Sequence, residues 1–286
     1  MIIQSKICVG ISNLSLKELF PLSLLSTPAV SIRKENKMWT ATAMLAHYLE
    51  SFTDSLVVTD QEETPIGVIG GAEIIKNIFE TPTSDFFDKK TVEEIFDKEL
   101  IQVNSETKLK DLIEKWEITR RAFCVIPNQY YGYSAISSRK LLEIGANCKT
   151  DIRVGDLPKK NHIATFNFDD TIGKIINMMF ENKTRKILLK NSQSFISDRI
   201  IIQTVAQNLD YLRGIENFLD MKFEKPFQLP DAKIVSEDLN FADLSKLMFG
   251  MMHPFVITKE HQVYSPWDIC QTLLSKDIEY QNQTPN

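Results

Sequence analysis

The spacing of apolar residues along the chain changes repeatedly between a pattern typical of strands and one typical of helices. These two patterns follow each other in the same order four times. Short apolar runs, such as residues 56–58, predict buried strands, and apolar residues spaced three or four apart, such as Ile74, Ile75 and Ile78, predict helices. From about residue 29 the order is strand, helix, strand, strand, helix. The same order returns from about residues 90, 152 and 217. The pattern therefore predicts four copies of one β-α-β-β-α unit.

The expected elements of the four copies are as follows. Copy one has strands at 29–32, 56–59 and 66–69 and helices at 43–52 and 74–79. Copy two has strands at 101–103, 123–126 and 133–136, a helix capped by Ser105 that buries residues 109–116, and a closing helix at 141–144. Copy three has strands at 162–166, 187–189 and 195–196, a helix at 172–180 capped by Asp169 and Asp170, and a longer amphipathic segment at 200–219 that serves as its closing helix and as the link to copy four. Copy four has strands at 233–235, 255–257 and 263–264 and helices at 241–251 and 269–274.

A junction between strand and closing helix recurs in each copy, at residues 70, 137, 197 and 265. Apolar residues run into a small or hydroxyl residue there, and a helical pattern follows. The alternate junctions, 70 with 197 and 137 with 265, have nearly the same separation, which indicates two tandem pairs. The first pair is expected at 1–148, with copies at about 25–80 and 90–146. The second is expected at 149–286, with copies at about 152–210 and 217–276, so the boundary lies between Gly145 and Asp151.

Composition places the chain among ordinary globular proteins. It has 286 residues, 43% of them hydrophobic and 25% charged, and its net charge is −5. That charge makes a strongly basic nucleic-acid-binding surface unexpected, although a local patch remains open. No apolar stretch has the length of a membrane span. We therefore expect a soluble, cytoplasmic protein.

The sequence offers little catalytic or metal chemistry. Four cysteines have no CxxC spacing, which favours reduced core thiols: Cys8, Cys124, Cys148 and Cys270. No GxxxxGK[ST] or HExxH motif occurs, and no cysteine has metal-ligand spacing with the histidines. No nucleophile–base arrangement can be inferred either. We therefore expect no enzyme, no metal and no required cofactor.

The repeated order and its junctions resemble the cystathionine-β-synthase (CBS) domain, whose tandem pair is called a Bateman module. The first copy reads LVVTD over residues 56–60 and GVIGGAE over 67–73, similar to the buried strand and the Gly-h-h-Thr/Ser-x-x-Asp motif of that family, where h is apolar. The resemblance extends from about Thr27 to about Leu274. It implies an α/β (α+β) fold of four CBS-type repeats paired into two Bateman modules. It also implies a regulatory module that binds AMP, ADP, ATP or S-adenosylmethionine and signals to a protein partner, with possible stacking of modules into a homodimer.

The resemblance also implies which residues would bind the nucleotide. The hydroxyl of the motif caps the closing helix, whose N-terminus favours phosphate, and the acid three residues later accepts the ribose hydroxyls. Copy four keeps both, as Ser265 and Asp268. Copy one keeps only an acid, Glu73, after Gly70. A plain helix start and a tight turn with a solvated Glu are the alternative readings of these two junctions.

Copies two and three keep the hydroxyls, Ser137 and Ser197, but replace the acid with Lys140 and Ile200, so both should be poor ribose sites. An arginine follows each serine two residues later, at 139 and 199, where a phosphate could bind. A capped helix with an exposed arginine is the alternative.

Basic residues also precede the buried strands of three copies, where the family often places groups that face phosphates: Arg120, Arg121, Arg185, Lys186 and His253. If copies three and four pair, Arg185 and Lys186 could face a phosphate whose ribose Asp268 binds. A solvated surface is the alternative.

Three functions remain open from the sequence. The chain is a nucleotide-binding regulator, a degenerate CBS scaffold that binds a protein partner, or a tRNA- or RNA-binding module that uses its arginines. The damaged motifs favour the scaffold, and the acidic composition disfavours RNA.

Overall fold

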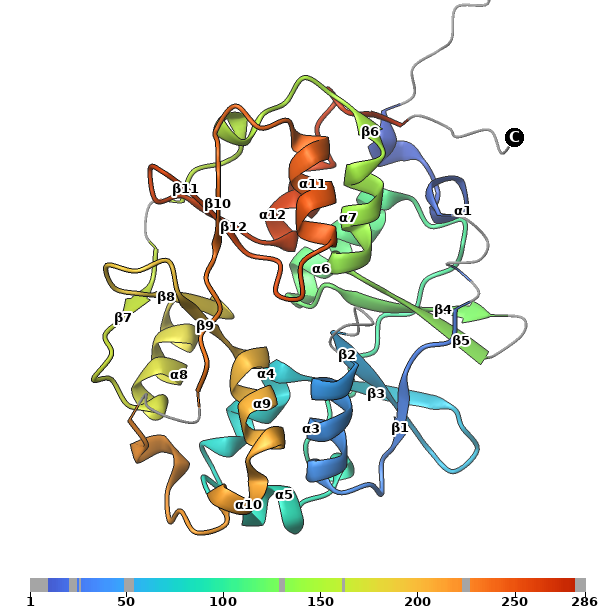
Figure 1. Cartoon of the computed structure of the whole chain (residues 1–286). Helices are drawn as coiled ribbons and strands as arrows, with labels where there is room; N and C mark the ends of the chain where they lie inside the picture. The colour runs from blue at the N-terminus through green and yellow to red at the C-terminus, as the bar shows by residue number, and fades with distance from the viewer. Residues whose placement is uncertain are drawn as a thin grey trace, which may run out of the picture. The chain divides into compact units, whose positions relative to one another are not determined.

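The computed structural model describes residues 10–20, 25, 27–48, 54–128, 132–160, 163–222 and 227–280 (Figure 1). The chain divides into two compact units. Unit 1 comprises Met1–Pro28, Ile101–Lys159 and Ile234–Asn286, and unit 2 comprises Ala29–Leu100 and Lys160–Lys233. Copies two and four thus lie in unit 1, and copies one and three in unit 2. The expected pairing of neighbouring copies, within 1–148 and within 149–286, stays a prediction.

Unit 2 repeats one strand arrangement twice. Copy one contains β1 (Ser31–Arg33), α3 (Met38–His47), β2 (Ser55–Thr59), β3 (Pro65–Gly70) and α4 (Gly71–Ile78). Copy three contains β7 (Thr165–Phe166), α8 (Ile172–Glu181), β8 (Lys186–Leu189), β9 (Phe195–Ser197) and α9 (Asp198–Gln207). In both, the first strand runs parallel to the second, and the third runs antiparallel to it. The central strand β2 is buried along its whole length, as its unbroken apolar run predicts.

Unit 1 holds the other two copies. Copy two contains α6 (Leu109–Thr119), β4 (Phe123–Asn128), β5 (Gly132–Ser137) and α7 (Ser138–Ala146). Copy four contains β10 (Lys233–Val235), α11 (Phe241–Phe249), β11 (Val256–Thr258), β12 (Val263–Tyr264) and α12 (Pro266–Thr272). In copy two a single parallel bridge from Gln102 to Val125 stands for the first strand. The predicted β-α-β-β-α order is therefore confirmed.

Short elements complete the described chain. Unit 1 adds η1 (Ile11–Asn13), α1 (Leu16–Leu19), β6 (Cys148–Lys149), η3 (Val154–Asp156) and β13 (Glu279–Tyr280), and β6 pairs antiparallel with β13. Unit 2 adds α5 (Asp85–Asp88), η2 (Val92–Glu94), α10 (Leu209–Leu212) and η4 (Phe218–Asp220).

Helices from copies distant in sequence pack together inside each unit. In unit 1, α7 lies against α11 and α12, and in unit 2, α9 lies against α3 and α4 (Figure 1). Small residues allow the approach: a Cβ on Gly145 of α7 would lie 2.5 Å from the Ser245 Oγ atom of α11. Each unit has its own apolar cluster, with Trp116 buried in unit 1 and Phe86 and Phe87 in unit 2. In unit 1 both copies contribute to one cluster, and in unit 2 Ile202 and Val205 of α9 join the cluster of copy one.

Two expectations about helix starts were wrong. Ser105 does not cap α6, because Asn104 and Thr107 form side-chain turns and delay the helix to Leu109. Thr171, rather than Asp169 or Asp170, caps α8: its hydroxyl accepts a hydrogen bond from the backbone N–H of Lys174. The segment expected as closing helix and link, 200–219, contains the end of α9 and the shorter α10 and η4. The side chain of Asn208 donates to the Thr204 carbonyl and ends α9. The expected helical positions Leu49 and Phe52, strand residue His162 and Cys8 lie outside the described residues.

Candidate CBS-type sites at four helix starts

All four predicted junctions are helix N-caps. Gly70, Ser137, Ser197 and Ser265 immediately precede α4, α7, α9 and α12, and each has extended backbone angles. This geometry turns the chain from the last strand directly into the closing helix and leaves the first N–H groups of the helix at the junction. The four positions are structurally equivalent, so differences between them are differences in side chains.

Copy four forms a capping box at its junction. The backbone N–H and the hydroxyl of Ser265 both donate to Oδ2 of Asp268, each at 2.7 Å. Both residues are partly exposed, and Pro266 takes the first helical position, where its missing N–H costs nothing. The carboxylate is therefore fixed over the helix N-terminus beside a hydroxyl, as the motif requires.

Copy one forms half of this arrangement. The N–H of Gly70 donates to Oε2 of Glu73 at 2.8 Å. A Cβ at residue 70 would lie 2.7 Å from the Ser55 Oγ atom, so close packing against β2 explains why no hydroxyl residue stands there. The longer carboxylate still reaches the junction.

The junctions of copies two and three lack the hydrogen bonds to a carboxylate that copies one and four form. Oγ of Ser197 accepts from the N–H of Ile200 at 3.2 Å, and Ile200 is buried, so this junction is an apolar helix start. Ser137 is also buried, yet its Oγ has no hydrogen-bond partner among the described residues. Nζ of Lys140 donates to the carbonyl of Ala135 at 2.7 Å, and burial lowers the pKa of this ammonium. Neither copy places a carboxylate at the third helical position.

The arginines that follow Ser137 and Ser197 do not face solvent. Arg139 and Arg199 are 3% and 8% exposed. Nη2 of Arg139 donates to the carbonyl of Met251, just beyond the end of α11, and Nη2 of Arg199 donates to the carbonyl of Leu45 in the last turn of α3 at 2.6 Å. Both carbonyls lie at helix C-termini, where cations are favoured. These arginines therefore join the two copies of each unit. The alternative of an exposed arginine was wrong, and phosphate binding by Arg139 and Arg199 stays a prediction.

Arg185 is engaged by a carboxylate. Its Nε donates to Oδ2 of Asp198 at 2.6 Å, and its Nη2 contacts the same oxygen. The Asp198 side chain is 6% exposed and that of Arg185 is 53% exposed. Burial alone would lower the pKa of Arg185, but the charge of Asp198, helped by Asp54 and Glu73, raises it. The surroundings of Arg185 are acidic, which disfavours a phosphate there.

The remaining basic residues occupy the expected places before the buried strands. Arg120 has a left-handed conformation (φ 54°) at the end of α6 and is exposed, and Arg121 precedes β4. Lys186 is the first residue of β8, and His253 lies in the bend before β11.

The predicted site residues divide between the units. Ser137, Arg120, Arg121, His253, Ser265 and Asp268 belong to unit 1, and Glu73, Arg185, Lys186 and Ser197 belong to unit 2. A site that combines Arg185 and Lys186 with Asp268 stays a prediction.

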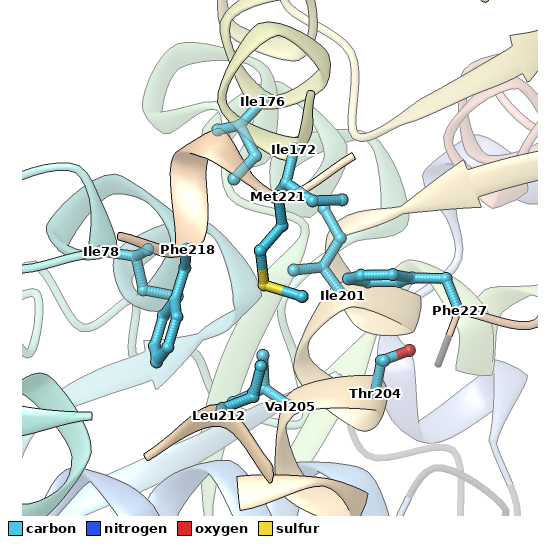
Figure 2. A pocket seen from close by; sticks show the side chains of 10 residues that line it. All are labelled: Ile78, Ile172, Ile176, Ile201, Thr204, Val205, Leu212, Phe218, Met221 and Phe227. Carbon is cyan, nitrogen blue, oxygen red and sulfur yellow. The ribbon is translucent and has the colours of Figure 1, made fainter. Parts of the chain in front are cut away.

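Unit 2 also contains an apolar pocket between α8, α9 and η4 (Figure 2). Ile172, Ile201 and Phe218 line it, and the side chain of Met221 points into its middle. Among the described residues of the lining, Thr204 alone carries a hydroxyl. These apolar walls offer few hydrogen-bonding groups to ribose or phosphate.

The sequence did not reveal the contacts of Lys140 and Asp198, which donate to the carbonyl of Ala135 and bind Arg185, respectively. Lys140 was read only as the loss of an acid, and Asp198 only as a residue between a serine and an arginine. Their positions at the start of a closing helix, next to the junction serine, were the available signal.

Among the described residues, no group of three or more His, Cys, Asp or Glu side chains could bind a metal ion, and no helix is both long and apolar enough to cross a membrane.

The fold is similar to solved structures. A protein from Methanocaldococcus jannaschii, MJ1225, proposed as an archaeal homologue of γ-AMPK, matches with a TM-score of 0.70 and 13% identity over 87% of this chain and 98% of its own. An uncharacterised conserved protein from Pyrococcus horikoshii matches with a TM-score of 0.53 and 8% identity over 88% and 98%. The CBS domain pair of MJ0100, solved with 5′-methylthioadenosine and S-adenosylmethionine, matches 46% of this chain and 95% of its own, with 16% identity and a TM-score of 0.36.

No protein-family model and no curated protein sequence matches the chain. The matches to the Methanocaldococcus and Pyrococcus proteins span 87% and 88% of this chain, and the order of strands and helices is that of four CBS-type units. The chain therefore has the fold of a tandem CBS-domain protein with four repeats.

Proposed function

We propose that the chain is a regulatory protein without catalytic activity that binds an adenosine nucleotide (AMP, ADP or ATP) or S-adenosylmethionine at the junction of copy four. The observation that carries the proposal is the Ser265–Asp268 capping box. Of the four equivalent junctions, this is the one that combines a hydroxyl with a carboxylate at the third helical position.

The chemistry follows from the two groups. A carboxylate has acceptor sites for two donors, and the ribose 2′- and 3′-hydroxyls are such a pair. Ser265 holds Oδ2 of Asp268 over the helix start, so the acceptor is positioned before any ligand arrives. A phosphate of the same ligand would be favoured near the N–H groups of α12. Ligand binding at copy four would then change the conformation of this chain, and a protein partner would recognise that change.

Calorimetric titration of the purified chain with AMP, ADP, ATP and S-adenosylmethionine tests this proposal. We expect Asp268→Asn to weaken nucleotide binding by about tenfold or more, because it removes a charged acceptor. Asp243→Asn is the matched control, since Asp243 lies at the third position of α11 in the same unit and is exposed. The proposal fails if no ligand binds at millimolar concentration, or if both variants bind like the wild type.

Asp268→Glu separates binding from helix capping. Glutamate preserves a capping box, so the variant should keep its thermal stability. The extra methylene displaces the acceptor from the ribose, so affinity should still fall.

A second candidate is a scaffold that binds a protein partner and no nucleotide. The junctions of copies two and three favour the scaffold, because their side chains make contacts inside the units. Ile200 is buried, and Arg139 and Arg199 donate hydrogen bonds to carbonyls of the other copy in their unit. A partner that co-purifies equally well with wild-type and Asp268→Asn protein, with and without AMP, would support the scaffold. The RNA-binding alternative loses support, because Arg139 and Arg199 are buried and Arg185 is paired with Asp198.

A further inference from the structure

We propose that the apolar pocket of unit 2 is a second binding site, for a small uncharged apolar molecule, and that Met221 must rotate before this ligand enters. The pocket lies between helices of copies one and three (Figure 2), and none of the four junction residues lines it. The inference therefore does not depend on the proposed nucleotide site.

The walls of the pocket determine the chemistry of the ligand. Helix α4 of copy one contributes Ile78, α8 contributes Ile172 and Ile176, and α9 contributes Ile201 and Val205. No described residue of the lining carries a charge. A charged group would lose its hydration here without gaining a partner, whereas a hydrocarbon group gains by leaving water. These walls therefore select an uncharged apolar ligand.

The size of the pocket limits the size of the ligand. About 380 Å³ of space lies between its side chains, part of it open to solvent. This volume is near the lower end of the range for ligand pockets, about 300–1,000 Å³. Apolar cavities of about 150 Å³ already stay dry and bind benzene. A ring or chain of about six carbon atoms is thus the expected scale.

Met221 fills the centre of this space. Its side chain points into the middle of the pocket (Figure 2). Met221 and Phe227 are half-buried, whereas Ile176 and Ile201 are fully buried, so the open side lies at the first two residues. A methionine side chain has three rotatable bonds and adapts to the shape of its surroundings. Rotation of this one side chain would clear the centre for a ligand.

The backbone around Met221 is fixed to both copies. Its carbonyl accepts from the N–H of Ile172 in copy three at 2.9 Å, and the N–H of Phe218 donates to the carbonyl of Pro82, just beyond copy one, at 2.7 Å. A Cβ on Gly173 of α8 would lie 2.9 Å from a side-chain atom of η4, so η4 packs tightly on α8. The pocket is therefore preformed apart from the Met221 side chain.

The test uses the full chain and straight-chain alcohols from butanol to octanol. Calorimetry measures their affinity, and the ¹³C-labelled methyl group of Met221, assigned from the signal that Met221→Leu removes, reports by NMR where they bind. We expect saturable binding that tightens about fourfold per methylene and levels off when the pocket is full. Hexanoate should bind at least about tenfold more weakly than hexanol, because no described lining residue compensates its charge. Excess AMP should not displace hexanol.

Met221→Ala should enlarge the pocket. We expect octanol to bind about threefold or more tightly to this variant, while the thermal midpoint falls because a cavity is left. Met252→Ala is the matched control, since Met252 is 45% exposed in unit 1, and it should change octanol affinity by less than about twofold.

Val205→Ile changes the pocket in the opposite direction. The added methylene occupies space beside α9, so hexanol should bind about threefold or more weakly, and filling the pocket should keep the protein folded with little loss of stability. Val235→Ile, the same change at a buried position of unit 1, is its control and should leave hexanol affinity unchanged.

The inference is overturned if no alcohol binds saturably, if affinity does not rise with chain length, or if the Met221 methyl signal does not respond. Hexanoate that binds as tightly as hexanol would contradict the assigned ligand chemistry. Displacement of hexanol by AMP would place the alcohol in a nucleotide site instead. Equal octanol affinities of Met221→Ala and Met252→Ala would also reject the pocket as the site.

Discussion

Arg199 in copy three donates a hydrogen bond to the carbonyl of Leu45 in copy one, across 154 positions of sequence, at 2.6 Å. Its Nη1 also donates to the carbonyl of Asp54 at 3.3 Å, just before β2. One buried guanidinium thus satisfies two carbonyls of another repeat. Arg139 makes the equivalent contact between copies two and four.

We predict that Arg199→Met lowers the free energy of unfolding by about 2–4 kcal/mol, because it leaves buried carbonyls without a donor. Arg199→Lys should recover part of the loss, since an ammonium can replace one hydrogen bond but not the planar pair. Urea unfolding followed by circular dichroism measures both. Arg153→Met is the control: Arg153 is 60% exposed, and its loss should change stability by less than about 0.5 kcal/mol. Equal effects of Arg199→Met and Arg153→Met would contradict the assigned role.

The second prediction concerns Gly71, the first residue of α4. A Cβ at this position would lie 2.3 Å from Oδ2 of Asp198, which Arg185 holds in place. Gly71→Ala should therefore cost about 1–3 kcal/mol, although alanine is normally the better helix former.

Gly250→Ala is the matched comparison for Gly71→Ala. The nearest atoms to a Cβ at residue 250 are 3.7 and 3.9 Å away, so this change should be neutral or slightly stabilising. Thermal melts of the two variants measure whether Gly71→Ala destabilises the protein and Gly250→Ala does not. A Gly71→Ala protein that melts at or above the wild-type midpoint would show that α4 and α9 are not in tight contact there.

Asp170 should make stability depend on pH. Its carboxylate is 7% exposed and accepts from Nζ of Lys174 at 2.5 Å and from the N–H of Asn167 at 2.7 Å. Burial alone would raise the pKa of Asp170, but the hydrogen bonds from Lys174 and Asn167 lower it below the usual value of an aspartate. A lowered pKa in the folded state gives a contribution that is present above the unfolded value and lost as pH falls through the folded value.

Asp170→Asn should therefore lower the free energy of unfolding near neutral pH by about 1–3 kcal/mol. The difference from the wild type should shrink as the pH falls below about 4. Urea titrations across this range measure it, with the exposed neighbour Asp169→Asn as control. A difference that stays constant with pH would refute the ionic origin of the effect.

The cysteines of unit 1 should resist alkylation. Burial raises the pKa of Cys124 to about 12 and that of Cys148 to about 11, so both stay protonated at neutral pH. Because the thiolate is the reactive form, iodoacetamide should label them slowly in the native protein and rapidly in denaturant. Mass spectrometry of digested peptides reports each cysteine separately. Fast native labelling of Cys124 would mean that the sheet of copy two opens readily.

The sequence was sufficient to predict the repeat order, because its signals are local. Apolar runs marked the strands, and the four junction residues became helix N-caps at the expected positions. The N-caps of α6 and α8 were missed, because several polar side chains precede each helix and the sequence does not show which of them is the cap. Contacts between copies one and three, such as that of Gly71 with Asp198, could not be predicted, because they join residues far apart in sequence.

Site chemistry was predicted less completely than fold. Ser265 and Asp268 could be found because they are close in sequence and match a motif. The roles of Arg139 and Arg199 could not, since a buried and an exposed arginine look alike until the helix end that accepts their hydrogen bonds is known.

The interleaving of the two units has a consequence for synthesis on the ribosome. The chain crosses between units after residues 28, 100, 159 and 233. Copy one therefore leaves the ribosome well before copy three. The carbonyls of Leu45 and Asp54 cannot accept their hydrogen bonds from Arg199 until copy three has been translated. The core of unit 1 is completed later, because its segment from Ile234 is translated after the last segment of unit 2. Apolar surface of the early copies is therefore exposed until the later copies have left the exit tunnel, and we expect chaperones that shield such surface to bind the nascent protein.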